Sequence, residues 1–339
     1  MIRSILPENV NFYKANLHCH TTFSDGSFTP EQVKKAYSEA GYSIVAYTDH
    51  DVFVRHPELR DENFLPLYGF ELEFGEGKNP WVRSKSCHIC FVSLDEDNPV
   101  HPLWHRSKYL FGGAKDHRDD VVFDPDVPDF EREYTPECIN EAIRIGREHN
   151  FFVTYNHPAW SLESYPEYSR YEGMDAMEIV NYGSVALGYF DHNGAAYDDL
   201  LREGKRLFCT ATDDNHNRMH GGSEYFDSFG GFTMIAAKEL TYEAISSALK
   251  KGEFYSSEGP EIYSLSYDTE TRELRVATSP AARIICTSAA RRSRIMCGSD
   301  PKVYVSEAVF TLDEYDDYAR ITVIDGNGKC AYSNAIFDL

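Results

Sequence analysis

Short apolar runs alternate with well-delimited helices through most of the chain, and this alternation restricts the fold more than any other feature. Thr29, Pro30 and Gln32 provide an N-cap, a first-turn proline and a capping-box glutamine, and Gly41 stands where the helix would end. The apolar run over residues 43–48 that follows is suited to a buried strand. The pattern of helix and strand recurs at residues 135–155 and 195–212. The chain therefore predicts an α/β fold around a parallel sheet, either open or closed into a barrel.

The pattern of alternating helices and strands stops after a helix expected near residues 241–251. Over residues 261–339, short β-rich runs are separated by turn residues such as Asp325-Gly-Asn-Gly, which predicts a small, sandwich-like all-β domain. The stretch 95–133 is acidic and interrupted by proline, and we expect it to be an insertion or a lid. We therefore expect an α/β domain over residues 1–260 and a β domain over residues 261–339.

The charge of the chain restricts its partners. Lys+Arg 33 against Asp+Glu 55 gives a net charge of −22, so long nucleic acid and anionic membranes are disfavoured. The first residues carry no apolar signal segment, and no run approaches roughly 18 consecutive apolar residues, so we expect a soluble, cytoplasmic protein. The eight cysteines are expected to be reduced and mostly buried. In a strand, Cys87 and Cys90 would face opposite sides, which argues against a zinc knuckle.

Histidine and carboxylate residues lie at or near the ends of the expected strands. They are His18, His20, Asp25, His50, Glu71, Glu73, His88, His157, Asp214 and His216. Because the carboxyl ends of parallel strands meet at one rim, these side chains are expected to converge there. A single histidine after a strand is more often structural, but repetition at strand after strand indicates a metal cluster, and this donor set suits zinc, manganese or iron. The remaining histidines are expected to be structural, with His192 and His220 as candidates to support the ligands.

The order and spacing of these motifs resemble the PHP (polymerase and histidinol phosphatase) family. The similar segments, within residues 10–260, are Asn16-Leu-His-Cys-His-Thr-Thr-Phe-Ser-Asp-Gly, Thr48-Asp-His-Asp, Gly69-Phe-Glu, His88, Asn156-His-Pro and Asp214-Asn-His. The resemblance implies a distorted (β/α)7 barrel that holds two or three divalent ions (Mn, Zn or Fe, with Mg also allowed) and has phosphoesterase activity. The run 249–260, followed by the β-rich segment, resembles a stand-alone subgroup of the family with a C-terminal β domain.

The resemblance also implies which residues hold which ion. One ion would be held by His18, His20, Glu71 and Asp214, a second by Glu71, His88 and His157, and a third by Asp25, His50 and His216. Strand periodicity alone does not choose between Glu71 and Glu73, and the Gly-x-Glu spacing of the family favours Glu71.

The expected reaction is hydrolysis of a phosphate ester by a hydroxide that bridges two ions. Candidates to deliver a proton to the leaving group are Asp213, His216 and His50, among which the sequence does not choose. Candidates to bind the substrate phosphate are Arg218, Arg83 and Lys115, of which Arg218 is best placed. The expected substrate is a small phosphorylated metabolite or a short nucleotide.

Two other functions stay open at this point. A barrel with clustered histidine and aspartate also serves hydrolases of other bonds, such as amidohydrolases, although no lysine stands at a strand end to form their bridging carboxylated lysine. The third hypothesis is a binding module with a vestigial metal site, which the nine ligand-type residues argue against. A hydrolysis screen of phosphomonoesters, phosphodiesters and amides with added Mn²⁺ would separate the three.

Overall fold

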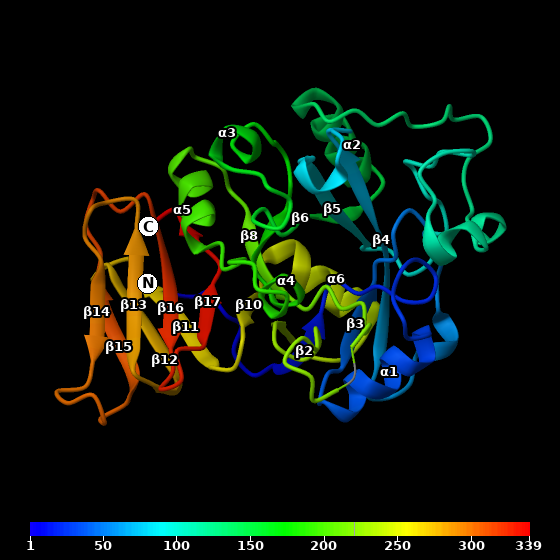
Figure 1. The fold of residues 1–339 in the computed structure, drawn as a ribbon. Coiled ribbons are helices and arrows are strands. Elements are labelled where there is room, and N and C mark those ends of the chain that lie inside the picture. Colours follow the sequence, from blue (N-terminus) through cyan, green and yellow to red (C-terminus); the bar gives the residue numbers. More distant parts are fainter. Residues whose placement is uncertain (220) are drawn as a thin grey trace.

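The computed structural model of the chain describes residues 1–219 and 221–339 (Figure 1). The strands are β1 (Ile2–Ser4), β2 (Asn11–Asn16), β3 (Ile44–Tyr47), β4 (Leu65–Gly75), β5 (Ser86–Ser93), β6 (Phe151–Tyr155), β7 (Ala176–Asn181), β8 (Phe208–Thr212), β9 (Phe232–Ala237), β10 (Phe254–Ser257), β11 (Ile262–Asp268), β12 (Glu273–Ala281), β13 (Arg283–Ser288), β14 (Arg294–Cys297), β15 (Val305–Thr311), β16 (Tyr318–Ile324), β17 (Cys330–Ser333) and β18 (Ile336–Phe337). The α-helices are α1 (Pro30–Glu39), α2 (Pro136–Glu148), α3 (Tyr165–Tyr168), α4 (Tyr182–Ala186), α5 (Gly194–Arg202) and α6 (Tyr242–Lys251). Short 3₁₀ turns are η1 (Pro57–Leu59), η2 (Trp81–Arg83), η3 (Gly112–Lys115) and η4 (Arg118–Asp120). None of the helices in this part of the chain combines the length and apolar character needed to cross a lipid bilayer.

The expected helices form where their end signals stand. The Thr29 hydroxyl accepts the Gln32 N–H at 3.3 Å, while the Gln32 side chain accepts the Thr29 N–H at 2.9 Å, which completes the capping box of α1. α2 and α6 likewise begin after threonine caps, Thr135 and Thr241. Each of these helices buries one apolar face against the sheet, which fixes where the next strand begins.

The large sheet is mixed, which corrects the parallel sheet expected from the sequence. Its hydrogen-bonded order is β14-β13-β16-β17-β10-β9-β2-β3-β4-β5-β6-β7-β8. β2, β3 and β4 run parallel, as do β6, β7 and β8, but β5 is antiparallel to both β4 and β6. The connection from β4 to β5 carries only the 3₁₀ turn η2, so the two strands pair as a hairpin rather than through a crossover helix.

The expected barrel is not closed by main-chain pairing in the described residues, because β8 ends the sheet. β8 meets β9 and β10 through hydroxyl side chains instead. Thr233 Oγ1 accepts the Ala211 N–H at 3.3 Å and donates to the Ala211 carbonyl at 3.0 Å. Ser256 Oγ donates to the Cys209 carbonyl at 2.7 Å. Side-chain hydroxyl groups thus bind backbone groups of β8 that would pair with a neighbouring strand in a closed barrel. The sheet therefore brings β8 close to β9 and β10 without main-chain hydrogen bonds between them in the part of the chain that the structure describes.

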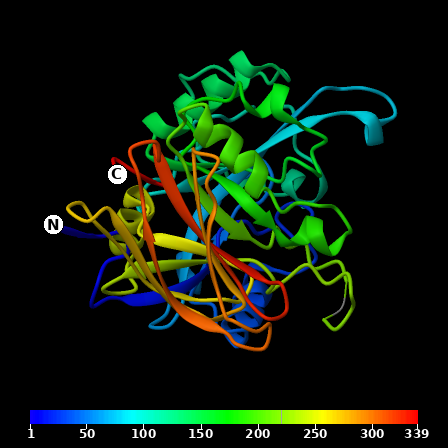
Figure 2. The same ribbon diagram turned by 90° about the vertical axis from the view of Figure 1, so that its left-hand side faces the viewer.

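The β-rich C-terminal part is joined to the remainder by strand pairing. β17 pairs with β10, and β1 from the N-terminus pairs with β11 in a second sheet of order β1-β11-β12-β15. Figure 2 shows the C-terminal strands, coloured yellow to red, on the side of the molecule that faces the viewer. The apolar core between the layers includes Leu265, Leu274, Ile284, Phe310 and Ile321. The division of the chain at residue 260 stays a prediction.

The segment 95–133, expected to be an insertion or lid, crosses the surface with the turns η3 and η4 and, as described, no strand or α-helix of its own. Its apolar side chains form a small core with Val52, just after β3; they are Trp104, Leu110, Ala114 and Val121. The Phe111 ring lies 4.9 Å from the His50 ring, measured between centroids. The segment therefore reaches the rim at which the strands end.

Candidate metal centre

The nine predicted ligands converge at one rim of the sheet, and strand direction explains why. Six of the predicted ligands come shortly after parallel strands. They follow β2, β3, β6 and β8, and they are His18, His20, His50, His157, Asp214 and His216. His88 lies near the start of β5, and since β5 runs antiparallel to β4 and β6, its start meets the ends of the others. The parallel bridges Cys19–Asn215 and His50–Glu71 hold these segments side by side.

Glu71 lies inside β4 rather than after it, because β4 extends well beyond the apolar run at residues 64–68. Strand alternation places Glu71 and Glu73 on one face. Glu71 is 1% exposed among the ligands, whereas Glu73 stands at the margin with its carboxylate 3.9 Å from His88 Nε2. The structure thus shows that Glu71 lies among the predicted ligands and Glu73 lies beside them, a distinction that strand periodicity alone could not make.

Two imidazoles and one carboxylate approach one another closely enough to share an ion. The Nε2 atoms of His18 and His20 are 3.1 Å apart and lie 3.2 and 3.1 Å from Asp214 Oδ1. Ligands bound tetrahedrally at roughly 2.0–2.1 Å from zinc are about 3.3 Å from one another, so the three spacings fit one ion. Glu71, predicted for the same ion, has its Oε1 3.3 Å from His18 Nε2.

The Glu71 carboxylate is shared among several imidazoles. Its Oε2 is 3.3 Å from both His20 Nε2 and His50 Nδ1. Its Oε1 is 3.2 Å from His88 Nδ1 and 3.5 Å from His157 Nε2. Glu71 forms one compact group with His50 and His88 and another with His18 and Cys90, whereas His157, predicted for the second ion, belongs to neither and stands slightly farther out. The two oxygens of the Glu71 carboxylate thus face different histidines.

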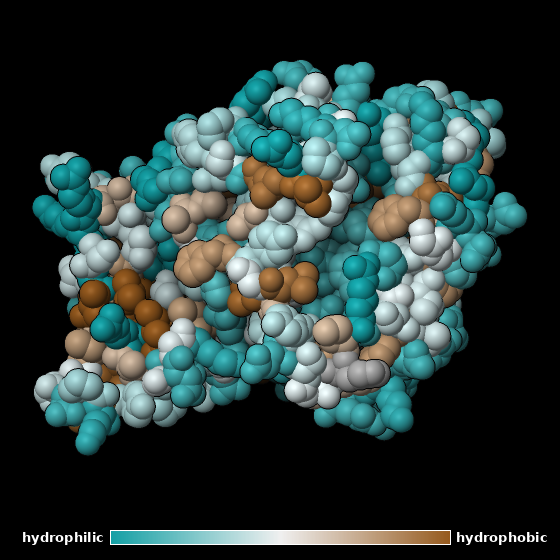
Figure 3. Space-filling view, in the orientation of Figure 1, coloured by the Kyte–Doolittle hydropathy of each residue, from teal (hydrophilic) through white to brown (hydrophobic). Residues whose placement is uncertain are grey.

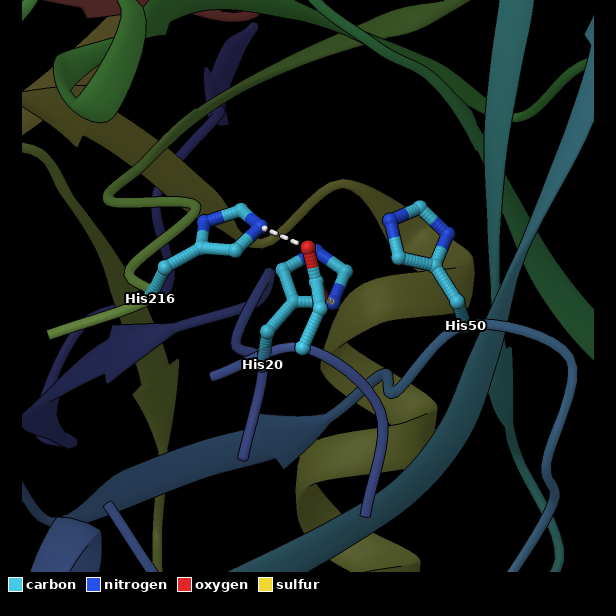
Figure 4. A group of neighbouring side chains, drawn as sticks. His20, His50 and His216 are labelled. Carbon is cyan, nitrogen blue, oxygen red and sulfur yellow. Dashed lines mark ion pairs between the residues drawn. The ribbon is translucent and has the colours of Figure 1, made fainter. Parts of the chain in front are cut away.

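A third group consists of His20, Asp25, His50 and His216 (Figure 4). His216 Nε2 is 3.2 Å from Asp25 Oδ2. The His20 ring stacks on the rings of both His50 and His216, with centroid distances of 4.5 and 4.4 Å. The structure therefore brings together the residues predicted for the third ion and adds His20 to them.

The cluster mixes buried carboxylates and imidazoles in a way that favours bound cations. Burial would raise the pKa of Glu71, but neighbouring imidazoles, His18 foremost, hold that pKa well below its usual range. Burial opposes protonation of His157, yet Glu71 and Asp214 raise its pKa to about 9. Burial lowers the pKa of His50 to about 3, which keeps this imidazole neutral. The buried carboxylates thus favour the protonated, positively charged form of some of the imidazoles. Divalent cations bound by the same side chains would supply that positive charge instead and would displace the protons.

Three buried atoms of the cluster form no hydrogen bond of normal geometry among the described residues, although two of them lie within 3.3 Å of other ligand atoms: His50 Nδ1, His88 Nε2 and Asp214 Oδ1. Each belongs to a predicted ligand and is an atom type that binds zinc, manganese or iron. A buried polar atom without a partner costs about 1–3 kcal/mol, so three such atoms in one place call for a ligand that satisfies them. The residues present therefore fit a group of divalent ions.

Three buried residues to which no role was assigned from the sequence hold the ligands in place. Glu178 on β7 accepts a hydrogen bond from His18 Nδ1 at 2.8 Å, which leaves Nε2 of that ring facing the cluster. The side-chain amides of Asn156 and Asn181 donate to carboxylate oxygens of two ligands, at 2.7 and 3.1 Å. A charged residue inside the otherwise apolar run 176–180 is the signal that could have identified Glu178.

Asp213, predicted as one of three proton donors, faces away from the cluster. Its Oδ1 accepts the N–H groups of Gly230 and Gly231 at 2.9 and 2.8 Å. Its Oδ2 accepts the Phe229 N–H and the Tyr37 hydroxyl, both at 2.8 Å. The carboxylate thus closes the loop that leads into β9 and does not line the cavity above the ligands. The structure thus places the Asp213 side chain away from the cavity, because consecutive residues after a strand point to opposite sides.

A cavity of about 420 Å³ lies above the ligands, and Arg218 is part of its wall. Arg218 Nη2 donates to Asp25 Oδ2 at 2.5 Å, so this predicted phosphate-binding residue reaches the site. The other two, Arg83 on η2 and Lys115 on η3, do not line the cavity. Both lie on turns that lead out over the surface, so closeness in sequence to the motifs did not bring them to the site.

Of the remaining candidates, His192 and Cys87 lie outside the cluster, whereas Cys90 forms a compact group with His18 and Glu71. His192 pairs with Glu258 at 3.0 Å and does not line the cavity; His220 lies outside the described residues. Cys87 and Cys90 are both in β5, whose alternation turns them to opposite sides, so they form no knuckle in the described structure. All eight cysteines are free thiols in the part of the chain that the structure describes.

We found no protein-family model that matches the chain. A 5′-3′ exoribonuclease of Haemophilus influenzae is 33% identical over 87 residues, which are 25% of this chain and 31% of that protein. The match thus spans less than a third of that relative's length.

Among solved structures, a two-domain protein of Bacteroides vulgatus that contains a predicted PHP-like metal-dependent phosphoesterase has a TM-score of 0.46 at 14% identity. The similarity covers 99% of this chain and 98% of that one. An amidohydrolase of Chromobacterium violaceum, with bound sulfate and no metal, has a TM-score of 0.38 at 15% identity and covers 60% of this chain and 87% of its own.

Proposed function

We propose that the chain is a metal-dependent phosphoesterase of the PHP type that acts on a small phosphorylated substrate with two or three divalent ions. The convergence of nine ligand residues around the shared carboxylate of Glu71, with unpartnered buried ligand atoms among them, is the observation that carries this proposal. When bound, the ions would provide a hydroxide at neutral pH and neutralise charge on the phosphoryl oxygens.

The protein's own side chains would bind the phosphate and protonate the leaving group. Arg218 is the one lysine or arginine among the described residues that line the cavity, so it is placed to bind a phosphoryl oxygen. The His216 side chain is 23% exposed and that of His50 is 7% exposed. Because His216 also adjoins Arg218 on the cavity wall, we assign it the transfer of a proton to the leaving oxygen in the form of the enzyme that holds two ions, in which His216 is not a ligand.

The lining also bears on the alternative of amide hydrolysis. Amidohydrolases typically use a carboxylated lysine between their ions, and no lysine occurs among the described residues that line this cavity. The net charge of −22 favours a small substrate over a long polyanion. We further propose a cytoplasmic location, which the free thiols support, and a lid function for residues 95–133, which the contact of Phe111 with His50 supports.

Hydrolysis assays with metal-loaded protein test the proposed function. Protein supplied with Mn²⁺, Zn²⁺ or Fe²⁺ should hydrolyse a generic aryl phosphate, and the double variant His18→Ala, His20→Ala should lose this activity while its circular dichroism is retained. His192→Gln, outside the cavity, is the matched histidine control and should remain active. Activity in the folded double variant, or hydrolysis of amides but of no phosphate ester, would overturn the proposal.

A further inference from the structure

The cavity above the ligands has two chemically different parts. Its floor consists of the metal ligands, and its apolar walls consist of Trp81, Phe111, Trp160, Leu187, Met219 and Tyr225. Several of these side chains are strongly exposed, with 64% of Trp81 and 59% of Leu187 accessible to solvent. Figure 3 shows apolar side chains gathered around the middle of the face that it views. Large exposed apolar side chains that surround a cavity mark a ligand-binding surface more often than chance exposure.

Trp81 and Trp160 come from separate loops and meet on one wall of the cavity. Their ring centroids are 6.2 Å apart with the planes at 61°. The Trp160 ring meets the imidazoles of His88 and His157 edge-on, with centroid distances of 5.2 and 5.1 Å. The main-chain N–H of Trp160 donates to the fully buried carboxylate of Asp191 at 2.9 Å, which fixes the backbone that carries the indole. The Trp160 indole is therefore held directly beside two metal ligands.

The same lining carries little positive charge. Arg218 is the one arginine among the described residues that line the cavity, and it already contacts Asp25. Glu73 and Asp227 add negative charge to the lining. A second phosphate or a carboxylate on the substrate would meet these acids without a further cation. A flat, uncharged ring would instead gain dispersion and stacking energy from the two indoles.

Given the proposed phosphoesterase function, on which this step rests, we infer that the substrate is an ester with a single phosphate and a flat, uncharged aromatic group. Trp81 and Trp160 form the wall that binds this aromatic group. They determine substrate specificity and take no part in the bond cleavage.

Benzyl phosphate and n-butyl phosphate test the inference, because their alcohols are leaving groups of similar quality and only one carries a ring. The kcat/KM for benzyl phosphate should be about tenfold higher. Trp81→Leu and Trp160→Leu should each lower kcat/KM for benzyl phosphate about 3- to 10-fold, chiefly through KM, and should leave the value for butyl phosphate within about twofold. Phe190→Leu is the matched control, because this ring is 84% exposed but does not line the cavity, and it should affect neither ester.

A binding measurement separates this inference from the proposed function. Calorimetric titration with benzylphosphonate and butylphosphonate, which have no ester bond to cleave, should show the same preference for the aromatic compound and its loss in Trp160→Leu. Equal hydrolysis of both esters with equal responses to the tryptophan variants would overturn the inference and leave the proposed function intact. Hydrolysis of no phosphate ester would overturn the proposed function, and equal affinity for both phosphonates would overturn the inference.

Discussion

Gly183 in α4 packs against the backbone that presents Asp214, so an alanine there should displace this ligand. A Cβ atom at position 183 would lie 2.6 Å from the Asp213 carbonyl oxygen and 2.9 Å from the Asp214 carbonyl oxygen. Real Cβ atoms essentially never come within 3.0 Å of such an atom, so the gap from 2.6 to 3.0 Å requires a shift of at least 0.4 Å. Metal–ligand distances hold to within about 0.2 Å, so a shift of this size exceeds what a bound ion tolerates.

We expect Gly183→Ala to weaken metal binding about 10- to 100-fold, which corresponds to about 1.4–2.7 kcal/mol. Calorimetric titration of metal-free protein with Mn²⁺ measures this loss, and circular dichroism checks the fold. Gly194→Ala at the start of α5 is the matched control, because a Cβ there would meet nothing nearer than Arg320 Nη2 at 3.8 Å. Wild-type Mn²⁺ affinity in a folded Gly183→Ala protein would refute the conclusion that this contact positions Asp214 as a ligand.

Three further predictions concern stability. Arg320 donates to both carboxylate oxygens of Asp198 at 2.7 Å in a buried pair, so Asp198→Asn should lower the free energy of unfolding by about 3–5 kcal/mol in denaturant titrations, and adding Arg320→Met should recover part of the loss. The hydrogen bond to Glu258 raises the pKa of His192 above 6.5, so its stabilisation is full below that pH and is lost as the pH rises through the raised pKa; the stability difference from His192→Gln should shrink accordingly. Mn²⁺ at about 100 times its Kd should add about 2.7 kcal/mol of stability that a chelator removes, seen as a fall of a few degrees in Tm by calorimetry. A constant difference between wild type and His192→Gln at every pH, or a Tm that ignores metal and chelator alike, would contradict the second and third of these.

The helices and most of the ligand motifs could be predicted because their signals are local. The capping box of α1 lies within four consecutive residues, Thr29 to Gln32, and needs no knowledge of the tertiary fold. The pairing direction of β5 could not be predicted, because it depends on the hairpin with β4 and not on the residues within the strand. The antiparallel direction is what brings His88 to the rim, so His88 reaches the predicted place although the sheet was expected to be parallel.

Contacts distant in sequence set the limit of prediction around the site. Glu178 and His18 are 160 positions apart, and only the fold shows that the carboxylate orients the ring. The same holds for Asp213, whose partners at residues 229–231 come from the other side of a loop. Residue type and spacing identify candidate ligands, whereas the residues that orient those ligands emerge only when the strands are assembled.

The elements that carry the predicted metal ligands also carry the aromatic side chains of the cavity wall, so the two parts of the cavity share their supporting backbone. The β4–β5 hairpin carries His88 within its strands and Trp81 on the turn between them. The loop after β6 carries His157 and, three positions later, Trp160, whose main-chain N–H donates to Asp191. A substitution that moves either element should therefore change ion affinity and recognition of the aromatic group together, whereas a change confined to one indole should alter recognition alone.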